Sequence, residues 1–284
     1  VVTAPEHIVV GAGVQMLLEI LCVLLKGRRT VSFPDGSFVQ GSTVFAAHGY
    51  TVRTRYKDAD IIYVSPSHMN RQGDVMPIQR RLELCAHSAD TGAVVIEDDF
   101  ENDFLYSSTP TPSLYALGSG NVVYMGAFSA LLLPGIRISF MVLSPALAAA
   151  YHQMKDTFAQ TASKTEQIAL CAYLRDGNMK SRTKKIRRLY TGKAKTLCAL
   201  LAKALPDHPV RVGENGLQVQ IETPMLPDSA PFEQAGLALY IVKEKSGKNL
   251  LVVSPSAVPA DRLEEAAHAV AAALYKAEEA AKAK

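Results

Sequence analysis

The sequence predicts an α/β protein in which a mostly parallel sheet flanked by helices is followed by a smaller α+β domain. Strands and helices alternate over the first 143 residues. Several strands, such as IIYV at 61–64 and VVIE at 94–97, are almost entirely apolar, as expected of strands that are buried on both faces. After residue 144 the pattern changes to long helices and then to a run of strands, which is typical of an α+β unit.

The elements of the first part follow from local periodicity and from turn residues. We expect strands at 7–10, 29–33, 50–54, 61–65, 93–97, 121–125 and 138–143, and helices at 14–25, 38–48 and 77–90. The first of these helices, VQMLLEILCVLL, is apolar on most sides and must therefore be buried. Ligands of parallel sheets bind at the carboxyl ends of the strands, so the polar residues that follow each strand are candidate site residues.

The second part begins with clear helix signals. Ser144 is followed by a proline, and Ser163 with Glu166 forms a capping box, so a helix is expected after each serine. A long helix is expected over 178–205, with Ile186, Leu189, Tyr190, Leu197 and Leu201 on one face. Strands at 210–212, 217–222, 237–243 and 250–253 and an alanine-rich helix from 261 follow. We place the domain boundary at Gly177, between a large domain (1–177) and a small one (178–284).

Composition excludes several classes of protein. The 284 residues are 48% hydrophobic and 20% charged, as in ordinary globular proteins, and a net charge of +3 is too small to indicate a nucleic-acid surface. No apolar run reaches the roughly 18 residues of a membrane helix, and the first residues do not resemble a signal peptide. We expect a cytoplasmic protein without a membrane segment. The four cysteines are far apart, so no metal site is expected.

A glycine-rich turn, VVGAGV at 9–14, joins a strand to a helix. Backbone N–H groups at such a helix start suit a phosphate. A dinucleotide fingerprint is a weaker interpretation, because Met16 stands where that motif needs a small residue. A tight turn without a ligand is the remaining alternative.

Polar residues follow other strands. Glu97, Asp98 and Asp99 end an apolar strand, and such acids need a cationic partner or an exposed loop. A carboxylate that faces a protonated ring nitrogen would satisfy this requirement. His68 is either a general base or a structural residue. The basic run at 180–195 is more typical of a solvated helix face than of a nucleic-acid surface.

The centre of the chain is the stretch 122–142, in which two apolar strands enclose a turn. Ser129 and Arg137 bracket the sequence LLLPGI and are placed to hold an anion together. Sites commonly lie in turns between buried strands, so we expect a binding site here.

These motifs together resemble a known family. The sequences VVGAGVQMLLEIL, SPSHMNRQGDVMPIQRRLEL, VVIEDDFENDFLY and YMGAFSALLLPGIRISFMV resemble, in this order, fold-type I pyridoxal-phosphate (PLP) aminotransferases of class I/II. They resemble more closely the aminotransferase-like domain of MocR-type (GntR-superfamily) transcription regulators. The resemblance extends over nearly the whole chain. It implies a large cofactor-binding domain with a mixed, mostly parallel sheet and a smaller C-terminal domain.

The resemblance also implies cofactor contacts. Gly13, Val14 and Gln15 match the loop that holds the cofactor phosphate, together with Ser129 and Arg137. Phe38 matches the aromatic residue that stacks on the pyridine ring, and Asn70 the asparagine that bonds the ring hydroxyl. Asp98 matches the carboxylate that keeps the ring nitrogen protonated, and Phe100 stands where relatives have a tyrosine that bonds the cofactor.

One departure decides the expected function. Ala130 stands at the position of the Schiff-base lysine, the amine that transamination uses as covalent anchor and as base. We therefore expect no catalytic residue and little or no transamination. Arg211 and Arg262 do not match the arginine that clamps a substrate carboxylate.

The leading hypothesis is the effector-binding and dimerisation domain of a MocR/GntR-type regulator. Such a domain would form a homodimer, bind PLP without a covalent bond or not at all, and respond to a small-molecule effector. DNA would be bound only through a winged-helix domain that is absent from this chain. The alternatives are a PLP-dependent aminotransferase carrying a lysine-to-alanine substitution and a cofactor-free dimerisation scaffold.

Overall fold

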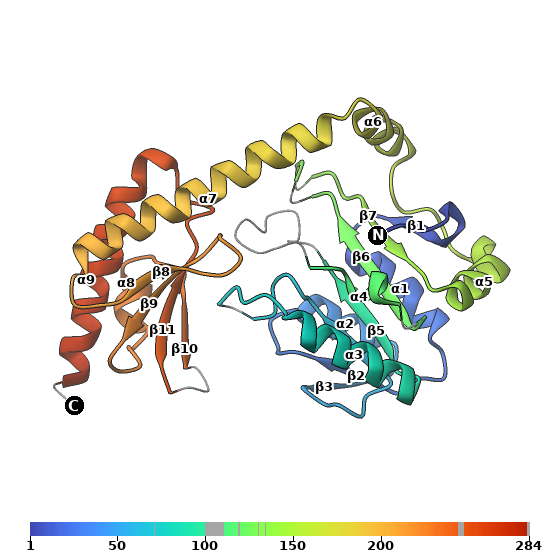
Figure 1. Ribbon diagram of the computed structural model, residues 1–284, viewed down its shortest axis with the longest axis horizontal. Coiled ribbons are helices and arrows are strands. Elements are labelled where there is room, and N and C mark those ends of the chain that lie inside the picture. Colours follow the sequence, from blue (N-terminus) through green and yellow to red (C-terminus); the bar gives the residue numbers. More distant parts are fainter. Residues whose placement is uncertain are drawn as a thin grey trace. The chain divides into compact units, whose positions relative to one another are not determined.

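The computed structural model describes residues 1–70, 72–99, 111–118, 120–129, 131–133, 135–243 and 247–282 (Figure 1). The chain forms two compact units. Within the described residues, the first comprises 1–69, 75–99 and 111–183, and the second comprises 70–74 with 184–282. Each unit has its own sheet, which confirms the predicted fold class.

The large sheet has seven strands in the order β1-β7-β6-β5-β4-β2-β3. Of these strands, β7 alone is antiparallel to its neighbours β1 and β6, and the others run in one direction. The bounds are β1 Ile8–Gly11, β2 Thr30–Phe33, β3 Thr51–Thr54, β4 Ile61–Val64, β5 Val94–Asp98, β6 Val122–Ala127 and β7 Ser139–Val142. The carboxyl ends of the parallel strands therefore share one edge with the start of β7, called the carboxyl edge below.

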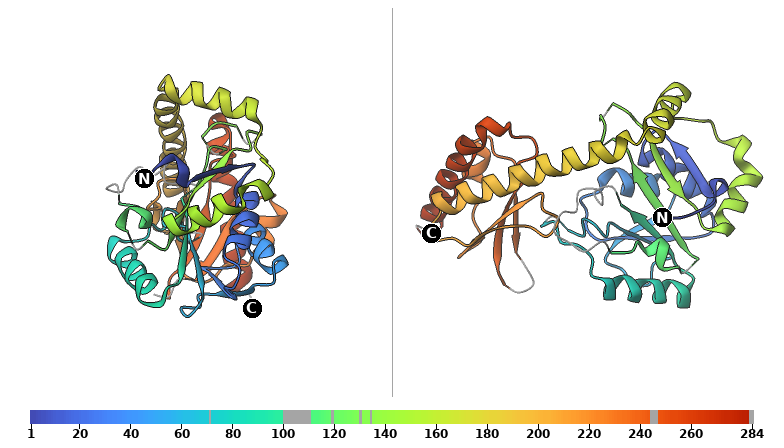
Figure 2. Two further views of the ribbon diagram at one scale, coloured as in Figure 1. Left: turned by 90° about the vertical axis from the view of Figure 1, so that its right-hand side faces the viewer. Right: turned by 45° about the horizontal axis from the view of Figure 1, so that its top comes forward.

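The helices of the first unit cover both faces of this sheet. They are α1 Val14–Leu24, α2 Val39–Ala47, α3 Ile78–Thr91, α4 Leu114–Leu117, α5 Pro145–Met154 and α6 Lys164–Arg175, with 3-10 turns at Pro5–His7 and Lys155–Thr157. One face packs against α1, α2 and α5, and the other against α3 and α4. The left view of Figure 2 shows α3 and the pair α1 and α2 on opposite sides of the strands. Burial of both faces explains why central strands such as β4 and β5 are mostly apolar, whereas the edge strand β3 is polar and largely exposed.

The core of the first unit follows the alternation of side chains along each strand. In β5, Val94 and Ile96 lie in the core beneath α1 and α2, whereas Val95 lies in the core beneath α3 and α4. The apolar helix α1 supplies Leu17, Leu18 and Leu21, which are fully buried in the first of these cores, as its composition predicts.

The second unit has a four-stranded antiparallel sheet in the order β10-β11-β9-β8. Its elements are β8 Val210–Val212, β9 Val219–Thr223, α8 Ala230–Gln234, β10 Tyr240–Lys243, β11 Asn249–Val253, a 3-10 turn at Ala260–Arg262 and α9 Leu263–Lys282. Apolar side chains of α7 and α9 pack on this sheet. Residues 70–74 join the unit through the Gln220 side chain, whose Nε2 donates to the Gln72 carbonyl over 2.8 Å.

The long helix α7 (Asn178–Ala204) contributes to both units, because the division falls between residues 183 and 184. Ile186, Leu197 and Leu201 are buried as predicted, but Leu189 is 52% exposed, so its assignment to the buried face is wrong. Thr191 and Ala194 are buried on this helix in addition. Ser163 caps α6 as predicted, because its Oγ accepts from the Glu166 amide; the second bond of the capping box, from the Ser163 amide to the Glu166 side chain, stays a prediction.

The helices of the described part of the chain were compared with the requirements of a membrane-spanning helix. None of them combines the length and the apolar composition that crossing a bilayer requires.

Candidate functional site

The carboxyl edge brings the ends of β1 and β6 together through β7. Ser139, the first residue of β7, pairs with Gly11 of β1 on one side and with Ala127 of β6 on the other. The bond from Phe128 N to Ile138 O, 3.1 Å long, continues the β6–β7 ladder beyond the strands. The turns that follow β1 and β6 are therefore held at the same level.

Gly13, Ser129 and Arg137 each lie two residues beyond these paired positions, in the segments that follow β1 and β6 and precede β7. Gly13 and Arg137 are in contact, because a Cβ atom built on Gly13 would lie 2.6 Å from Nη2 of Arg137. The guanidinium thus lies directly against the Gly13 backbone. Gly13 has φ +93°, a conformation that favours glycine, so both its backbone angle and its contact with Arg137 require a residue without a side chain.

Gly13 is also the N-cap of α1. The first N–H groups of a helix have no partner within the helix and form the positive end of its dipole. Val14 and Gln15 supply two of these groups, and the first turn contains no acidic residue that would compensate them. The helix start and the Arg137 guanidinium therefore form a cradle for an anion, called the Gly13–Arg137 cradle below.

Asp98 lies at the same edge, at the end of β5, and is 6% exposed. Its Oδ2 accepts a hydrogen bond from the Tyr63 hydroxyl of β4. Burial, followed by the negative charge of Asp98 and this hydrogen bond, raises the pKa of Tyr63 well above 10. The phenol therefore stays protonated and donates, and the carboxylate keeps further capacity to accept.

An aromatic cluster surrounds this pair. The Tyr63 ring lies 5.0 Å from the Phe33 ring and 5.3 Å from the Phe38 ring. Phe38, the N-cap of α2, folds back over Gly41, where an added Cβ atom would clash with its ring. The structure thus connects Phe38 with Asp98 through Tyr63. Tyr63 was not among the predicted site residues. Its hydroxyl, within the otherwise apolar strand IIYV, could have indicated a buried polar partner.

The other two acids of the triplet have separate partners. Glu97 is completely buried on the face of α3 and α4, where it accepts from the backbone amides of Leu114 and Tyr115. The guanidinium of Arg81, also buried, lies 3.9 Å away. Glu97 therefore has the cationic partner that buried acids require. This partner is Arg81, which was not among the residues predicted from the sequence.

Asp99 is half-buried and accepts hydrogen bonds from the hydroxyls of Ser67 and Tyr124. Burial raises the pKa of its carboxyl, although these two bonds oppose the shift. The neighbouring residue of Ser67, His68, was a candidate general base, and that role stays a prediction.

In the described part of the chain, no three His, Cys, Asp or Glu side chains are grouped as metal ligands.

Asn70 makes its hydrogen bonds within its own turn. Its Nδ2 donates to Asp74 Oδ2 over 2.7 Å, and its Oδ1 accepts from the amides of Gln72 and Asp74. Its expected contact with a ring hydroxyl stays a prediction. Phe100 and Ala130 lie outside the described residues.

Comparison with known proteins identifies the family. The family model "Aminotransferase class I and II" matches residues 55–242, about two thirds of the chain. The chain belongs to this family. The match includes the strands β4 and β5, which carry Tyr63 and Asp98, and the strand β7 that follows Arg137.

Its relatives include both regulators and enzymes. The HTH-type transcriptional regulator YdeL of Bacillus subtilis is 30% identical over 233 residues, which cover 77% of this chain and 50% of that protein. The probable rhizopine catabolism regulatory protein MocR of Rhizobium meliloti is 28% identical, with 77% of this chain and 47% of that protein covered. The chain thus spans about half the length of these relatives.

Solved structures agree on the fold. LysN, the α-aminoadipate aminotransferase of Thermus thermophilus, aligns with a TM-score of 0.76 and 23% identity, covering 98% of this chain and 79% of that one. That structure contains N-(5'-phosphopyridoxyl)-L-leucine. The present chain therefore has the fold-type I architecture of PLP-dependent aminotransferases.

Membership of the aminotransferase family implies a site for PLP, and the residues present fit this group. The Gly13–Arg137 cradle has the donors that a phosphate requires. Asp98 is a buried acceptor of the kind that favours a protonated ring nitrogen. Both lie at the carboxyl edge, where ligands of parallel sheets bind.

The buried Glu97 predicts a pH-dependent stability. Burial raises the pKa of its carboxyl from 4.5 to about 7, although the amides of Tyr115 and Leu114 favour ionisation. Between these values the folded state binds more protons than the unfolded state, so the free energy of unfolding falls as pH rises. The loss from this group is at most about 3 kcal/mol. Glu97→Gln should make the decline of stability between pH 4.5 and 7 shallower in urea unfolding experiments.

Glu83→Gln is the matched control, because Glu83 lies on the exposed surface of α3. It should keep the wild-type dependence on pH. An unchanged slope in Glu97→Gln would show that Glu97 does not titrate in this range.

Proposed function

We propose that this chain is the effector-binding and dimerisation domain of a MocR-type transcription regulator and that it binds PLP without a covalent bond. The observation that carries the proposal is the Gly13–Arg137 cradle, with its helix start and cation in contact. The sequence contains no lysine between Lys57 and Lys155. Similarity to YdeL and MocR supports a regulator.

Each group at the carboxyl edge has a separate task in this proposal. Arg137, Ser129 and the amides of Val14 and Gln15, which follow the N-cap Gly13, hold the phosphate. Phe38 covers one face of the ring. Asp98 holds the ring nitrogen in its protonated form, and bound PLP then supplies an electron sink.

Tyr63 acts on the ring nitrogen only through Asp98. Its protonated hydroxyl donates to one carboxylate oxygen and so fixes the orientation of the carboxylate. A charge-assisted bond from a ring N–H to the carboxylate contributes roughly 1.5–3 kcal/mol. Tyr63 is therefore a positioning residue in this site.

Ala130 explains why binding would not lead to turnover. A methyl side chain neither forms the covalent anchor nor transfers a proton. His68, the candidate base among the sequence motifs, belongs to the loop after β4 and does not replace the amine as an anchor. The proposed domain therefore senses a ligand and does not convert it.

A second candidate is a PLP-dependent aminotransferase whose lysine has been replaced by Ala130. Its support is the structural similarity to the α-aminoadipate aminotransferase LysN over nearly the whole chain. A third is a cofactor-free dimerisation scaffold. The experiments below separate the three.

Loss of the cation should weaken cofactor binding. Arg137→Ala is expected to reduce the affinity for PLP by about 10- to 100-fold, because a charge-assisted hydrogen bond contributes roughly 1.5–3 kcal/mol. Calorimetric titration with PLP measures this change. Pyridoxal, which lacks the phosphate, should bind equally to the wild type and to the variant.

The control is Arg175→Ala at the exposed end of α6, which should leave both affinities unchanged. Equal PLP affinity in Arg137→Ala would show that the phosphate lies elsewhere. A wild-type chain that binds neither compound would favour the scaffold.

Restoring an amine separates the regulator from the enzyme. Ala130→Lys is expected to react with PLP, and borohydride reduction followed by mass spectrometry measures the covalent adduct. A regulator forms the adduct without turning over amino donors. Turnover of an amino donor by this variant would favour the aminotransferase, and no adduct would show that residue 130 does not face the cofactor.

The proposed dimer is tested by sedimentation velocity. Homodimerisation is part of the proposed role, and the exposed apolar side chains Leu133 and Ile168, 61% and 72% accessible, are candidate interface residues. We expect a species of twice the 30.7 kDa chain mass at about 10 μM protein, a concentration at which micromolar dimers form. A chain that stays monomeric there would contradict the dimerisation role.

A further inference from the structure

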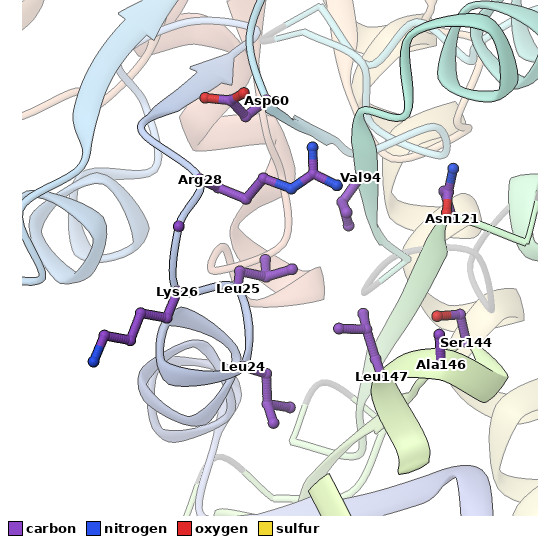
Figure 3. A pocket seen from close by; sticks show the side chains of 11 residues that line it. Leu24, Leu25, Lys26, Arg28, Asp60, Val94, Asn121, Ser144, Ala146 and Leu147 are labelled. Carbon is purple, nitrogen blue, oxygen red and sulfur yellow. The ribbon is translucent and has the colours of Figure 1, made fainter. Parts of the chain in front are cut away.

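A cavity of about 460 Å³ lies at the edge of the large sheet opposite the carboxyl edge (Figure 3). It is lined by residues at the amino ends of the parallel strands: Asp60 precedes β4, Val94 begins β5 and Asn121 precedes β6. Ser144, which follows the antiparallel strand β7, completes this wall. All lining residues belong to the first unit. We propose that this cavity is a binding site for a small organic carboxylate.

The cavity has an apolar wall. Leu24 and Leu25, at the end of α1, and Leu147, in the first turn of α5, line it. Figure 3 shows the side chains of Leu25 and Leu147 on facing sides of the space. A volume of this size is in the range of small-molecule sites. Much of the remaining lining is polar and includes Arg28, Asp60, Asn121 and Ser144.

Arg28 supplies the cation. Its Nη2 donates to the carbonyl of Gly92 over 2.9 Å, which anchors the guanidinium across the cavity. Figure 3 shows it pointing from the segment that precedes β2 toward Val94. A guanidinium has five N–H donors, so this one bond leaves donors for a carboxylate. Lys26 points away from the space in the same view and is not needed by the site.

Ser144 supplies a second, independent group. It is 4% exposed, and within the part of the chain that the structure describes its hydroxyl makes no capping hydrogen bond to α5. Its oxygen is directed to the interior of the cavity in Figure 3. A serine hydroxyl both donates and accepts hydrogen bonds, so it can bond a carboxylate that enters the cavity.

The start of α5 lies beside this hydroxyl. Ala146 and Leu147 line the cavity, and their amides belong to the first helical turn, whose N–H groups lack partners within the helix. The ten-residue helix α5 carries no acidic residue in this turn. Its positive end thus adds to Arg28 in favouring an anion.

The facing charges select the type of anion. Asp60 lies in the cavity wall, and its Oδ2 accepts from the amides of Arg29 and Thr30 and from the Thr30 hydroxyl. These bonds, with the charge of Arg28, lower the pKa of its carboxyl, so Asp60 is ionised at neutral pH. Its negative charge repels a dianion such as HPO₄²⁻ about twice as strongly as it repels a monoanion at the same distance. A monoanionic carboxylate with an apolar body fits both the charge and the leucine wall.

The probe is 4-methylpentanoate, titrated into the full chain with ¹³C-labelled leucine methyl groups and followed by NMR. We expect saturable shifts of the Leu24, Leu25 and Leu147 methyl signals below about 10 mM. The amide of the same acid should bind at least about tenfold more weakly, because it lacks the charge that Arg28 recognises. Inorganic phosphate should give no saturable shift of these signals. Binding of phosphate in preference to the carboxylate, or no saturable shift with 4-methylpentanoate, would overturn the proposal.

Two variants test the polar groups separately. Ser144→Asp keeps a favourable N-cap for α5 but places a negative charge in the cavity, so it should reduce affinity at least about tenfold in a folded chain. Arg28→Gln should have an effect of the same size. Arg29→Gln is the matched control, because the exposed side chain of Arg29 does not line the cavity. Unchanged affinity in Ser144→Asp would overturn the proposal even if Arg28→Gln failed to fold.

Discussion

The pairing of β7 with β1 and β6 is the constraint on which the carboxyl edge depends. One antiparallel strand between two parallel ones sets the start of β7 beside the ends of both neighbours. Arg137 consequently meets the first turn of α1 although 124 positions separate it from Gly13. An insertion that shifted this register by one residue would turn every side chain of β7 to the other face and would separate the cation from the helix start.

The acid triplet shows how one strand serves two faces. Side chains alternate along β5, so Glu97 faces α3 and α4. There its carboxylate accepts hydrogen bonds from two backbone amides and lies near the guanidinium of Arg81. Asp98 faces the aromatic cluster and is held by Tyr63. The first acid fixes the strand end in the structure, and the second is left at the carboxyl edge for the proposed cofactor. Burial of both is tolerated because each has partners, as buried carboxylates require.

The two edges of the large sheet present different chemistry. At the carboxyl edge, the start of α1 and Arg137 form a cradle suited to a phosphate. At the other edge, the start of α5, Arg28 and an apolar wall enclose a cavity that also contains Asp60. Because the sheet lies between them, a ligand at one edge does not contact the other, and any coupling between the two sites would pass through strands and helices such as α1.

The sequence by itself determined the fold class, the order of the elements and the family. Strand alternation, helix periodicity and caps such as Ser163 are local patterns that act over a few residues, and these elements form where they are expected to within a few positions. The resemblance also identified Gly13, Arg137 and Asp98 as site candidates. Tertiary structure alone decided which partners these residues meet. Tyr63, Arg81 and Ser144 acquire their roles from side chains distant in sequence, and Leu189 is exposed although its helical spacing places it among apolar residues. Contacts of this kind depend on strand order and on the packing of whole helices, which no local pattern encodes.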